Sequence, residues 1–166
     1  SRWERAREGS VKALQLKSDI QDEIGDWAGL YETNRIISKL SKDEFVQQEA
    51  VVLMAKSLHR RKKHGKAIKL LDQALEQYGT YWEALRAMYN IAMETGDFPT
   101  AVKFANRLIK DHPSITHTSL KAEALIFTKK FGEALKLTRK IMKSKEINPD
   151  LAGKIVSNMI GIVLGT

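Results

Sequence analysis

Four histidines are the side chains in this 166-residue sequence that are best suited to bind a metal ion or to transfer a proton. They form two pairs, His59 with His64 and His112 with His117, and each pair is separated by five positions. Two histidines that bind one metal ion from one face of a helix stand four positions apart, as in the H-E-x-x-H motif. No acidic residue lies between the members of either pair. We therefore predict that these histidines are solvent-exposed turn residues and that the chain has no metal site.

The sequence contains none of the short motifs that mark common catalytic sites. It has no G-x-S-x-G nucleophile motif, no phosphate-binding Walker loop and no G-x-G-x-x-G dinucleotide fingerprint. Asp19, Asp22 and Glu23 are close together, but their spacing indicates the polar face of a helix rather than a catalytic carboxylate pair. The absence of cysteine excludes a disulfide framework and favours a reducing, cytoplasm-like compartment. We therefore expect no catalytic activity and no cofactor.

Basic residues are in excess and gather in one segment. Lys and Arg number 28 against 20 Asp and Glu, a formal net charge of +8, and residues 59–66 read HRRKKHGK. This run has two interpretations. It is either a helix end whose cations complement the helix dipole and stay in water, or a patch for acidic protein, nucleic acid or anionic lipid. No aromatic residue interleaves the run, as single-stranded nucleic acid would require, so nucleic-acid binding is disfavoured.

The sequence lacks the features of a membrane or secreted protein. No apolar run has the length of a membrane span, and no signal peptide is visible. The hydrophobic share of 43%, with only three prolines, predicts a folded chain with an apolar core. The chain begins with Ser1 rather than methionine, so we expect it to be excised from a longer protein. Membrane contact is expected only through parts outside this sequence.

Residues 81–113 predict two helices joined by a tight turn. Apolar residues recur at three- and four-residue steps on both sides of Gly96 and Asp97. Glycine permits the positive φ that ends a helix, and aspartate can cap the next helix. Segments with the same pattern begin at Glu49 and Ser119, at offsets of 34 and 33 residues. A small residue recurs in the second helix of each copy, at Ala67, Ala101 and Ala134.

These residues resemble the tetratricopeptide repeat (TPR), a helix–turn–helix unit of 34 residues. Phe98 is similar to its turn aromatic, Ala101 to its first close-packing alanine and Pro113 to its final proline, whereas Tyr89 and Leu108 stand where the family prefers smaller residues. The resemblance implies an all-α fold, a right-handed α-solenoid of antiparallel helix pairs in a single domain over residues 1–166. We predict about four repeats and a C-terminal helix, at residues 11–40 (a degenerate copy), 48–79, 82–113, 115–146 and 149–163.

The two ends of the chain carry further signals. Residues 25–27 (GDW) repeat the turn pattern in the degenerate first copy, where Leu30 replaces the expected alanine. Ser41 and Glu44 form a capping box that predicts the start of a long helix. The segments GDW and LSKDEF also resemble a bacterial inner-membrane TPR family associated with haem synthesis. The broad apolar face of the helix at 149–163 predicts packing against the last repeat, a second copy or other sequence.

In TPR proteins the first helices of successive repeats line a concave surface that binds an extended peptide or a partner's helix. The inward positions that the resemblance implies include Glu49, Val52 and Glu83. Arg86 and Asn90 are similar to half of the family's carboxylate clamp, but the next repeat lacks the matching Lys and Asn, which disfavours recognition of a chaperone tail. The predicted groove residues are Lys56, Arg60, Arg86, Asn90, Glu123 and Phe127. They suit a protein or peptide partner that carries acidic and apolar residues.

The favoured function is a non-catalytic protein–protein interaction scaffold that holds a partner peptide or helix in this groove. Two alternatives remain open. The apolar C-terminal helix could make the chain an oligomerisation module, and hence a homo-oligomer, or the basic surface could bind nucleic acid.

Overall fold

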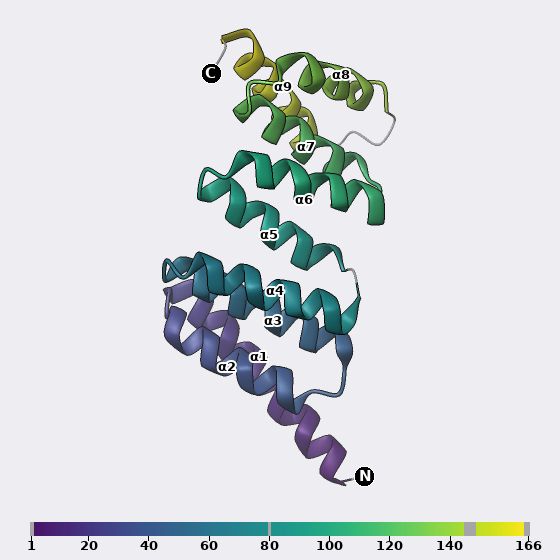
Figure 1. The fold of residues 1–166 in the computed structure, drawn as a ribbon. Helices are drawn as coiled ribbons and strands as arrows, with labels where there is room; N and C mark the ends of the chain where they lie inside the picture. Colours follow the sequence, from purple (N-terminus) through teal and green to yellow (C-terminus); the bar gives the residue numbers. More distant parts are fainter. Residues whose placement is uncertain (1, 80, 145–148, 165–166) are drawn as a thin grey trace. The chain divides into compact units, whose positions relative to one another are not determined.

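The computed structural model describes residues 2–79, 81–144 and 149–164, and these residues form nine α-helices and no strand (Figure 1). The helices are α1 (Arg2–Ile24), α2 (Trp27–Leu40), α3 (Glu44–Arg60), α4 (His64–Tyr78), α5 (Trp82–Glu94), α6 (Phe98–Asp111), α7 (Ile115–Phe127), α8 (Phe131–Met142) and α9 (Pro149–Leu164). Consecutive helices pack against each other, as α1 does on α2, α3 on α4 and α7 on α8. The predicted all-α repeat fold is therefore confirmed.

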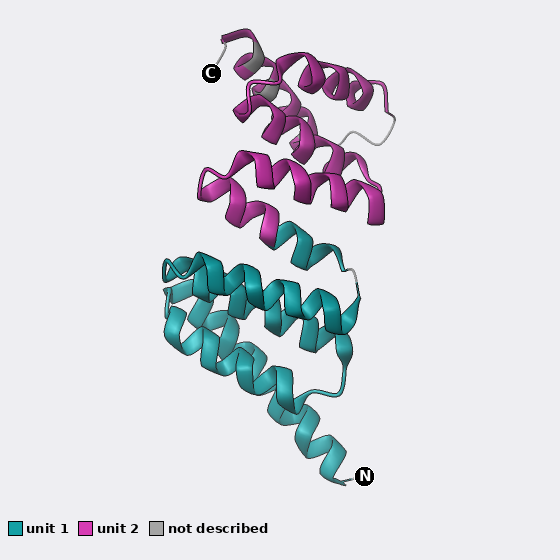
Figure 2. Cartoon of the chain, viewed as in Figure 1, with its two compact units in different colours: residues 1–87 teal, residues 88–166 magenta. Residues whose placement is uncertain are grey.

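The chain divides into two compact units, residues 1–87 (unit 1) and residues 88–166 (unit 2), and the boundary falls within α5 (Figure 2). Each unit has its own buried apolar side chains. The single domain over residues 1–166 stays a prediction.

The core of unit 1 forms where the apolar faces of its helices meet. Val11 of α1, Ile37 of α2 and Ala50 of α3 are buried together, and the half-buried side chains that pack against them are Leu14, Leu40 and Val46. Leu30 is completely buried. The residues at the corresponding position of the following repeats are also completely buried, and they are Ala67, Ala101 and Ala134. The close-packing positions predicted from the sequence are therefore core positions.

Polar side chains are also buried between α1 and α2. Asn34 Nδ2 donates to Ser18 Oγ at 2.7 Å, and the Thr33 hydroxyl donates to Gln21 Oε1, also at 2.7 Å. A buried polar group is tolerated when its hydrogen bonds are made, and it then restricts how the two helices can pack. These two bonds fix the position of α2 along α1.

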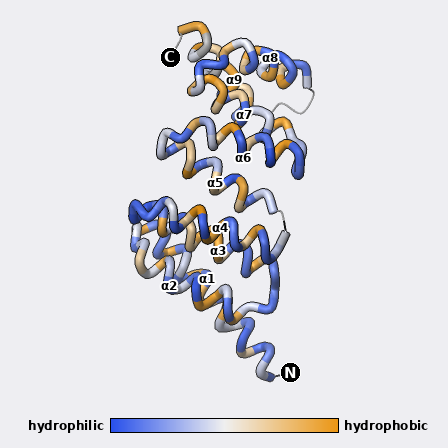
Figure 3. The backbone as a smooth tube through the Cα atoms, in the orientation of Figure 1, coloured by the Kyte–Doolittle hydropathy of each residue, from blue (hydrophilic) through white to orange (hydrophobic). Residues whose placement is uncertain are grey.

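The core of unit 2 has two parts. Leu125 and Ile126 of α7 are buried with Ala134 of α8, and the side chains that pack against them are Val102, Phe131 and Leu137. Leu151 and Ile155 of α9 are buried against Ile141 of α8. One face of the C-terminal helix thus packs on the last helix pair. Packing against the last repeat was one of the three possibilities predicted for this helix. Figure 3 shows α9 as a largely hydrophobic helix, in contrast to the hydrophilic α3–α4 turn of unit 1.

The turn between the two helices of a pair recurs four times with the same backbone geometry. Gly25, Lys62, Gly96 and Lys129 all have a positive φ, between 59° and 79°. In each turn the amide of the next residue donates to the carbonyl five positions earlier, at 2.8 or 2.9 Å. This is the bond that ends a helix with a left-handed residue. The turns predicted at residues 25 and 96 are therefore confirmed, and lysine takes the glycine position in the other two.

The two lysine turns also lack the cap that the two glycine turns have. Asp26 and Asp97 accept hydrogen bonds from the backbone amides of the helices that they begin, whereas Lys63 and Lys130 make no such bond with their side chains. The lysine turns are therefore the less favourable version of the same local structure.

Substitution of Lys62 or Lys129 by glycine is expected to raise the free energy of unfolding by about 1 kcal/mol at each site. The reason is that a side chain in the left-handed region costs roughly 1–2 kcal/mol, which the greater chain entropy of glycine offsets only in part. Urea unfolding followed by circular dichroism measures the change. Lys66→Gly, at an exposed position within α4, is the control and should lower stability by about 1 kcal/mol. If glycine changes the free energy of unfolding in the same direction at residues 62 and 66, the result would contradict the turn geometry.

Two local predictions about helix starts are wrong. Ser41 does not cap α3; it ends α2, and its Oγ accepts from the amide of Asp43 at 3.1 Å. Asp43 is the cap instead, accepting from the Phe45 amide, while Glu44 accepts from Gln48 rather than reaching back. The first helix begins at Arg2 rather than near residue 11, because the charged residues at the start of the chain are good helix formers with no proline among them.

Candidate partner-binding faces

The groove residues predicted on α3 lie on its C-terminal half. Lys56 Nζ lies 2.6 Å from Asp22 Oδ2 of α1, so this lysine forms an ion pair within unit 1. Asp22 was predicted only as part of a polar helix face, and the structure gives it this specific contact. Arg60 is exposed one turn further along α3. The structure therefore places Arg60 at the surface, while Lys56 also links two helices.

Arg86 and Asn90 lie on one side of α5, because residues four positions apart in a helix project from the same face. Arg86 is half-buried and Asn90 is exposed. Half of a carboxylate clamp was predicted from this pair. The structure brings the two side chains onto one helix face, and the clamp itself stays a prediction.

The groove residues predicted on α7 both contact neighbouring helices of unit 2. The hydroxyl of Tyr89, on α5, lies 2.9 Å from the Leu120 carbonyl oxygen and 3.2 Å from Glu123 Oε2. This explains why a tyrosine stands where the TPR pattern prefers a small residue, since its hydroxyl reaches α7. The ring of Phe127 is stacked on that of Phe98, with centroids 4.8 Å apart, yet Phe127 is 50% exposed. Phe127 therefore presents an apolar surface at a fixed position.

A cleft of about 360 Å³ lies in unit 1 between α3 and the start of α5. Its apolar lining comes from Phe45, Val52, Leu53 and Tyr81, and its polar lining from Gln48, Glu49 and Glu83. Three of these residues, Glu49, Val52 and Glu83, occupy inward positions implied by the TPR resemblance. The sequence prediction missed Phe45 and Tyr81, which were not assigned to the binding face. The position of one aromatic residue just after the start of α3 and of the other just before α5 was the sequence signal that could have indicated them.

Tyr81 is an unusual side chain in this cleft. It is 8% exposed, and among the residues that the structure describes its buried hydroxyl has no hydrogen-bond partner. Burial raises the pKa of the Tyr81 phenol well above its ordinary value, and the negative charge of Glu83 and the nearby Tyr78 raise it further. The phenol therefore stays protonated at physiological pH and keeps both a donor and an acceptor.

The histidines are not the solvent-exposed turn residues that the sequence predicted. His59 and His117 are buried. His59 Nδ1 lies 2.7 Å from His64 Nδ1, and His117 Nδ1 lies 2.6 Å from the carbonyl oxygen of His112. The five-residue spacing crosses a helix boundary in both cases, so the second residue of each pair lies in the first turn of the next helix and its ring contacts the first residue. In the described ranges no three His, Cys, Asp or Glu side chains are grouped as a metal site would need.

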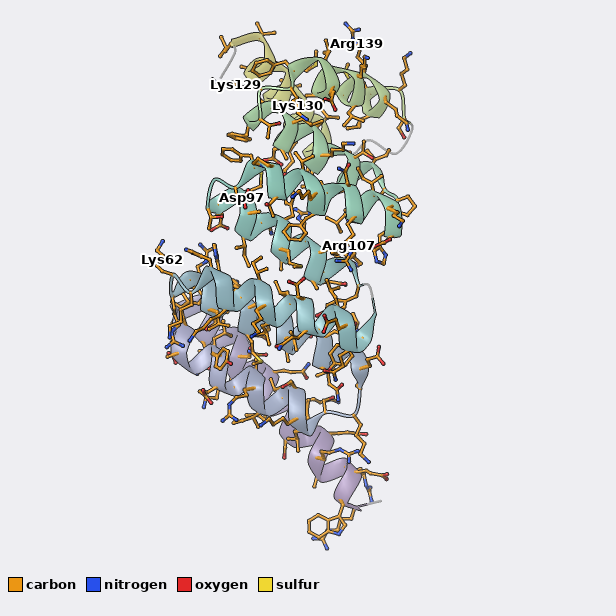
Figure 4. All side chains as sticks on the ribbon, viewed as in Figure 1. Lys62, Asp97, Arg107, Lys129, Lys130 and Arg139 are labelled. Atoms are coloured by element: carbon orange, nitrogen blue, oxygen red, sulfur yellow. The ribbon has the colours of Figure 1, made fainter. Side chains whose placement is uncertain are left out.

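Basic side chains project from the two lysine turns. Lys62 extends outward from the α3–α4 turn of unit 1, and Lys129 and Lys130 lie in the α7–α8 turn of unit 2 (Figure 4). The basic run at residues 59–66 therefore includes the end of α3, the turn and the start of α4, rather than a helix end alone. Within the residues that the structure describes, no helix is long and apolar enough to cross a membrane.

Comparison with protein families gives one match over most of the chain. Residues 48–164 match the family described as the TT21 fifth ARM repeats domain. The chain belongs to this family. ARM repeats, like TPRs, are stacked helical units of an α-solenoid. No curated protein matches the chain.

Solved structures similar to this family member are also helical repeat proteins. A tetratricopeptide repeat protein from Parabacteroides merdae superposes with a TM-score of 0.73 at 15% identity over 95% of this chain, which spans only 60% of that protein. The MamA RS-1 ArsTM double mutant and a Podospora anserina protein of nearly identical TPR-like repeats each give a TM-score of 0.64. The MamA mutant is 10% identical to this chain, and the alignment covers 93% of each chain. The Podospora protein is 11% identical, and the alignment covers 94% of each chain.

These similarities confirm the TPR-like repeat fold and extend no further, because the identities are low. They do not confirm the resemblance to the haem-associated family. Repeat folds of this kind serve as scaffolds for protein interactions, and this chain has that fold.

Proposed function

We propose that this chain is a non-catalytic scaffold that binds a segment of another protein along the exposed faces of α3, α5 and α7, the first helices of its repeats. The observation that carries the proposal is the exposure of Arg60, Asn90 and Phe127 on helices whose other faces are buried. In solenoid proteins such faces form the extended binding surface.

The chemistry of these faces favours a partner with acidic and apolar residues. Arg60 and Arg86 carry positive charge that pairs with carboxylates, Asn90 can hydrogen-bond to an extended backbone, and Phe127 offers an apolar contact. Arginine and aromatic residues also contribute most to binding at protein interfaces. Each unit presents its own part of this surface.

The double substitution Arg86→Ala with Asn90→Ala is expected to weaken partner binding about thirtyfold. It removes one charge-assisted and one neutral hydrogen bond, together about 2 kcal/mol, from side chains that are not part of the core. The amount of each protein that co-purifies with the tagged chain, quantified by mass spectrometry, measures the loss.

The control is Lys69→Ala with Lys103→Ala, which changes exposed residues on the second helices α4 and α6. The helical content of both variants should equal that of the parent by circular dichroism. Undiminished binding of the Arg86/Asn90 variant would rule out this face of α5.

A second candidate function is self-association through α9. Val156, Ile160 and Val163 are between 53% and 82% exposed on α9, although its opposite face is buried. Light scattering should then show a dimer, and Val156→Lys with Ile160→Lys should convert it to a monomer, because buried lysines at an apolar interface are costly. A mass that stays monomeric at all concentrations would remove this candidate and leave α9 as a cap of the last repeat.

A further inference from the structure

The cleft between α3 and the start of α5 has an acidic lining. Its polar lining includes two carboxylates, Glu49 and Glu83, in a chain with a formal net charge of +8. Glu49 is exposed and Glu83 is half-buried, and the lining of the cleft includes no basic residue. Two carboxylates in a cleft without a basic side chain favour a cationic group, because opposite charges attract across an interface.

The walls of the cleft are apolar. Phe45, 63% exposed, and the half-buried Val52 and Leu53 form a surface suited to the methylene groups of a long side chain. The volume of about 360 Å³ is within the range of natural binding pockets. Apolar walls and a charged rim together match an amphipathic side chain rather than a purely apolar one.

The Tyr81 hydroxyl is an independent sign that the cleft has an occupant. A buried phenol normally has a hydrogen-bond partner, and this hydroxyl has none among the described residues of the chain. Tyr81 lines the same cleft as the two carboxylates. The hydroxyl is covered in the unbound chain, so the phenol must rotate toward the cleft before its oxygen accepts from a cation beside Glu83.

We infer that this cleft binds the side chain of an arginine or lysine in the partner segment, with its stem against Phe45, Val52 and Leu53 and its cation between Glu49 and Glu83. The inference rests on the proposed function and adds a basic residue to the acidic and apolar residues proposed for the partner. It also gives the segment a direction, because the face of α3 is acidic near its start, at Glu49, and basic near its end, at Arg60.

The spacing of the two charges follows from the geometry of a helix. Glu49 and Arg60 are separated by about 16 Å along α3 at 1.5 Å per residue. An extended segment covers that distance in about five residues at 3.3 Å each. The basic residue of the partner should therefore lie about five positions from an acidic one.

Selection of a random 12-residue peptide library displayed on phage against the immobilised 166-residue chain tests the inference. Enriched peptides should share an arginine or lysine about five positions from an aspartate or glutamate. Fluorescence anisotropy of the best peptide then measures its affinity for the parent chain and its variants. Glu49→Gln with Glu83→Gln should weaken binding at least tenfold, and Tyr81→Phe about threefold. Glu76→Gln, at an exposed position of α4, should have no effect.

A peptide in which citrulline replaces the arginine has nearly the same shape without the charge, and it completes a double-mutant cycle. The citrulline peptide should bind the parent chain at least tenfold more weakly than the arginine peptide does. Its affinity for the Glu49→Gln/Glu83→Gln variant should be little lower than its affinity for the parent chain. The variants must have the helical content of the parent, which circular dichroism checks.

Each other outcome overturns the inference, and one of them overturns the proposed function as well. Enriched peptides without a basic residue, or with affinities that the glutamine substitutions leave unchanged, would overturn the inference and leave the proposed function intact. A library that yields no binding peptide would contradict the proposed function and the inference with it. The chain could also prove to be a dimer that becomes a monomer when Glu49 and Glu83 are both replaced by glutamine. In that case a second copy occupies the cleft and the inference is wrong.

Discussion

Replacement of Leu30 by alanine is expected to lower the free energy of unfolding of unit 1 by about 3 kcal/mol. Leu30 is completely buried near the start of α2, at the position that later repeats fill with alanine. The first repeat is therefore packed around a large side chain, and its removal leaves a cavity that the backbone cannot close. Urea unfolding followed by circular dichroism at 222 nm gives the change.

Leu16→Ala provides the control, because Leu16 lies on α1 with 63% of its surface exposed. The same atoms are removed there, and the loss should stay below about 0.5 kcal/mol. The reverse change in unit 2, Ala101→Leu, should cost about 1–3 kcal/mol, since Ala101 is fully buried with no room for three more carbon atoms. Equal effects of Leu16→Ala and Leu30→Ala would show that residue 30 is not the close-packing position of the first repeat.

Replacement of Gly29 by alanine is expected to lower the stability of unit 1 by about 2 kcal/mol. A Cβ atom at residue 29 would lie 2.0 Å from Asp26 Oδ2 and 2.1 Å from Gln21 Nε2. These two atoms are hydrogen-bonded to each other at 3.1 Å, and Asp26 Oδ1 also caps α2 by accepting from the Gly29 amide at 2.9 Å. Alanine would displace both side chains and remove the cap and a half-buried hydrogen bond, each contributing about 1 kcal/mol.

Gly65→Ala is the matched control for this substitution. Gly65 is near the start of α4, as Gly29 is near the start of α2, but a Cβ atom there meets nothing within 4 Å. Alanine at residue 65 should therefore raise stability by about 0.5–1 kcal/mol through its higher helix propensity. If both alanine variants are more stable than the parent, the hydrogen bonds around Asp26 contribute nothing to the stability of the first helix pair.

The repeat architecture could be predicted because its determinants are local. A glycine followed by aspartate and an aromatic residue sets a turn regardless of what surrounds it, and the alternation of small and large apolar residues sets the helix faces. The lysine turns were harder to find, since Lys62 and Lys129 have no intrinsic preference for the positive φ that they adopt. Only their alignment with Gly25 and Gly96 indicates their role.

The candidate site was predicted less well, because it depends on contacts between residues one repeat apart. Lys56 with Asp22, and Glu123 with Tyr89, are each 34 positions apart, and both pairs join the first helices of neighbouring repeats. Residues predicted to face a partner thus also hold the repeats together. A search for complementary side chains at the repeat spacing could have found both pairs. The buried position of His59 depends on how α4 folds back onto α3, which helix periodicity alone does not determine.

Site-specific photo-cross-linking in cells tests the central claim most directly. The photoreactive residue p-benzoylphenylalanine replaces Glu94 or Thr116 on the first helices α5 and α7, or Lys69 or Lys103 on the second helices, all of them exposed positions. If the chain is a scaffold that binds a partner along its first helices, positions 94 and 116 should cross-link to the same protein several-fold more efficiently than positions 69 and 103. Cross-links of equal yield from all four positions, or only from the second helices, would contradict the account.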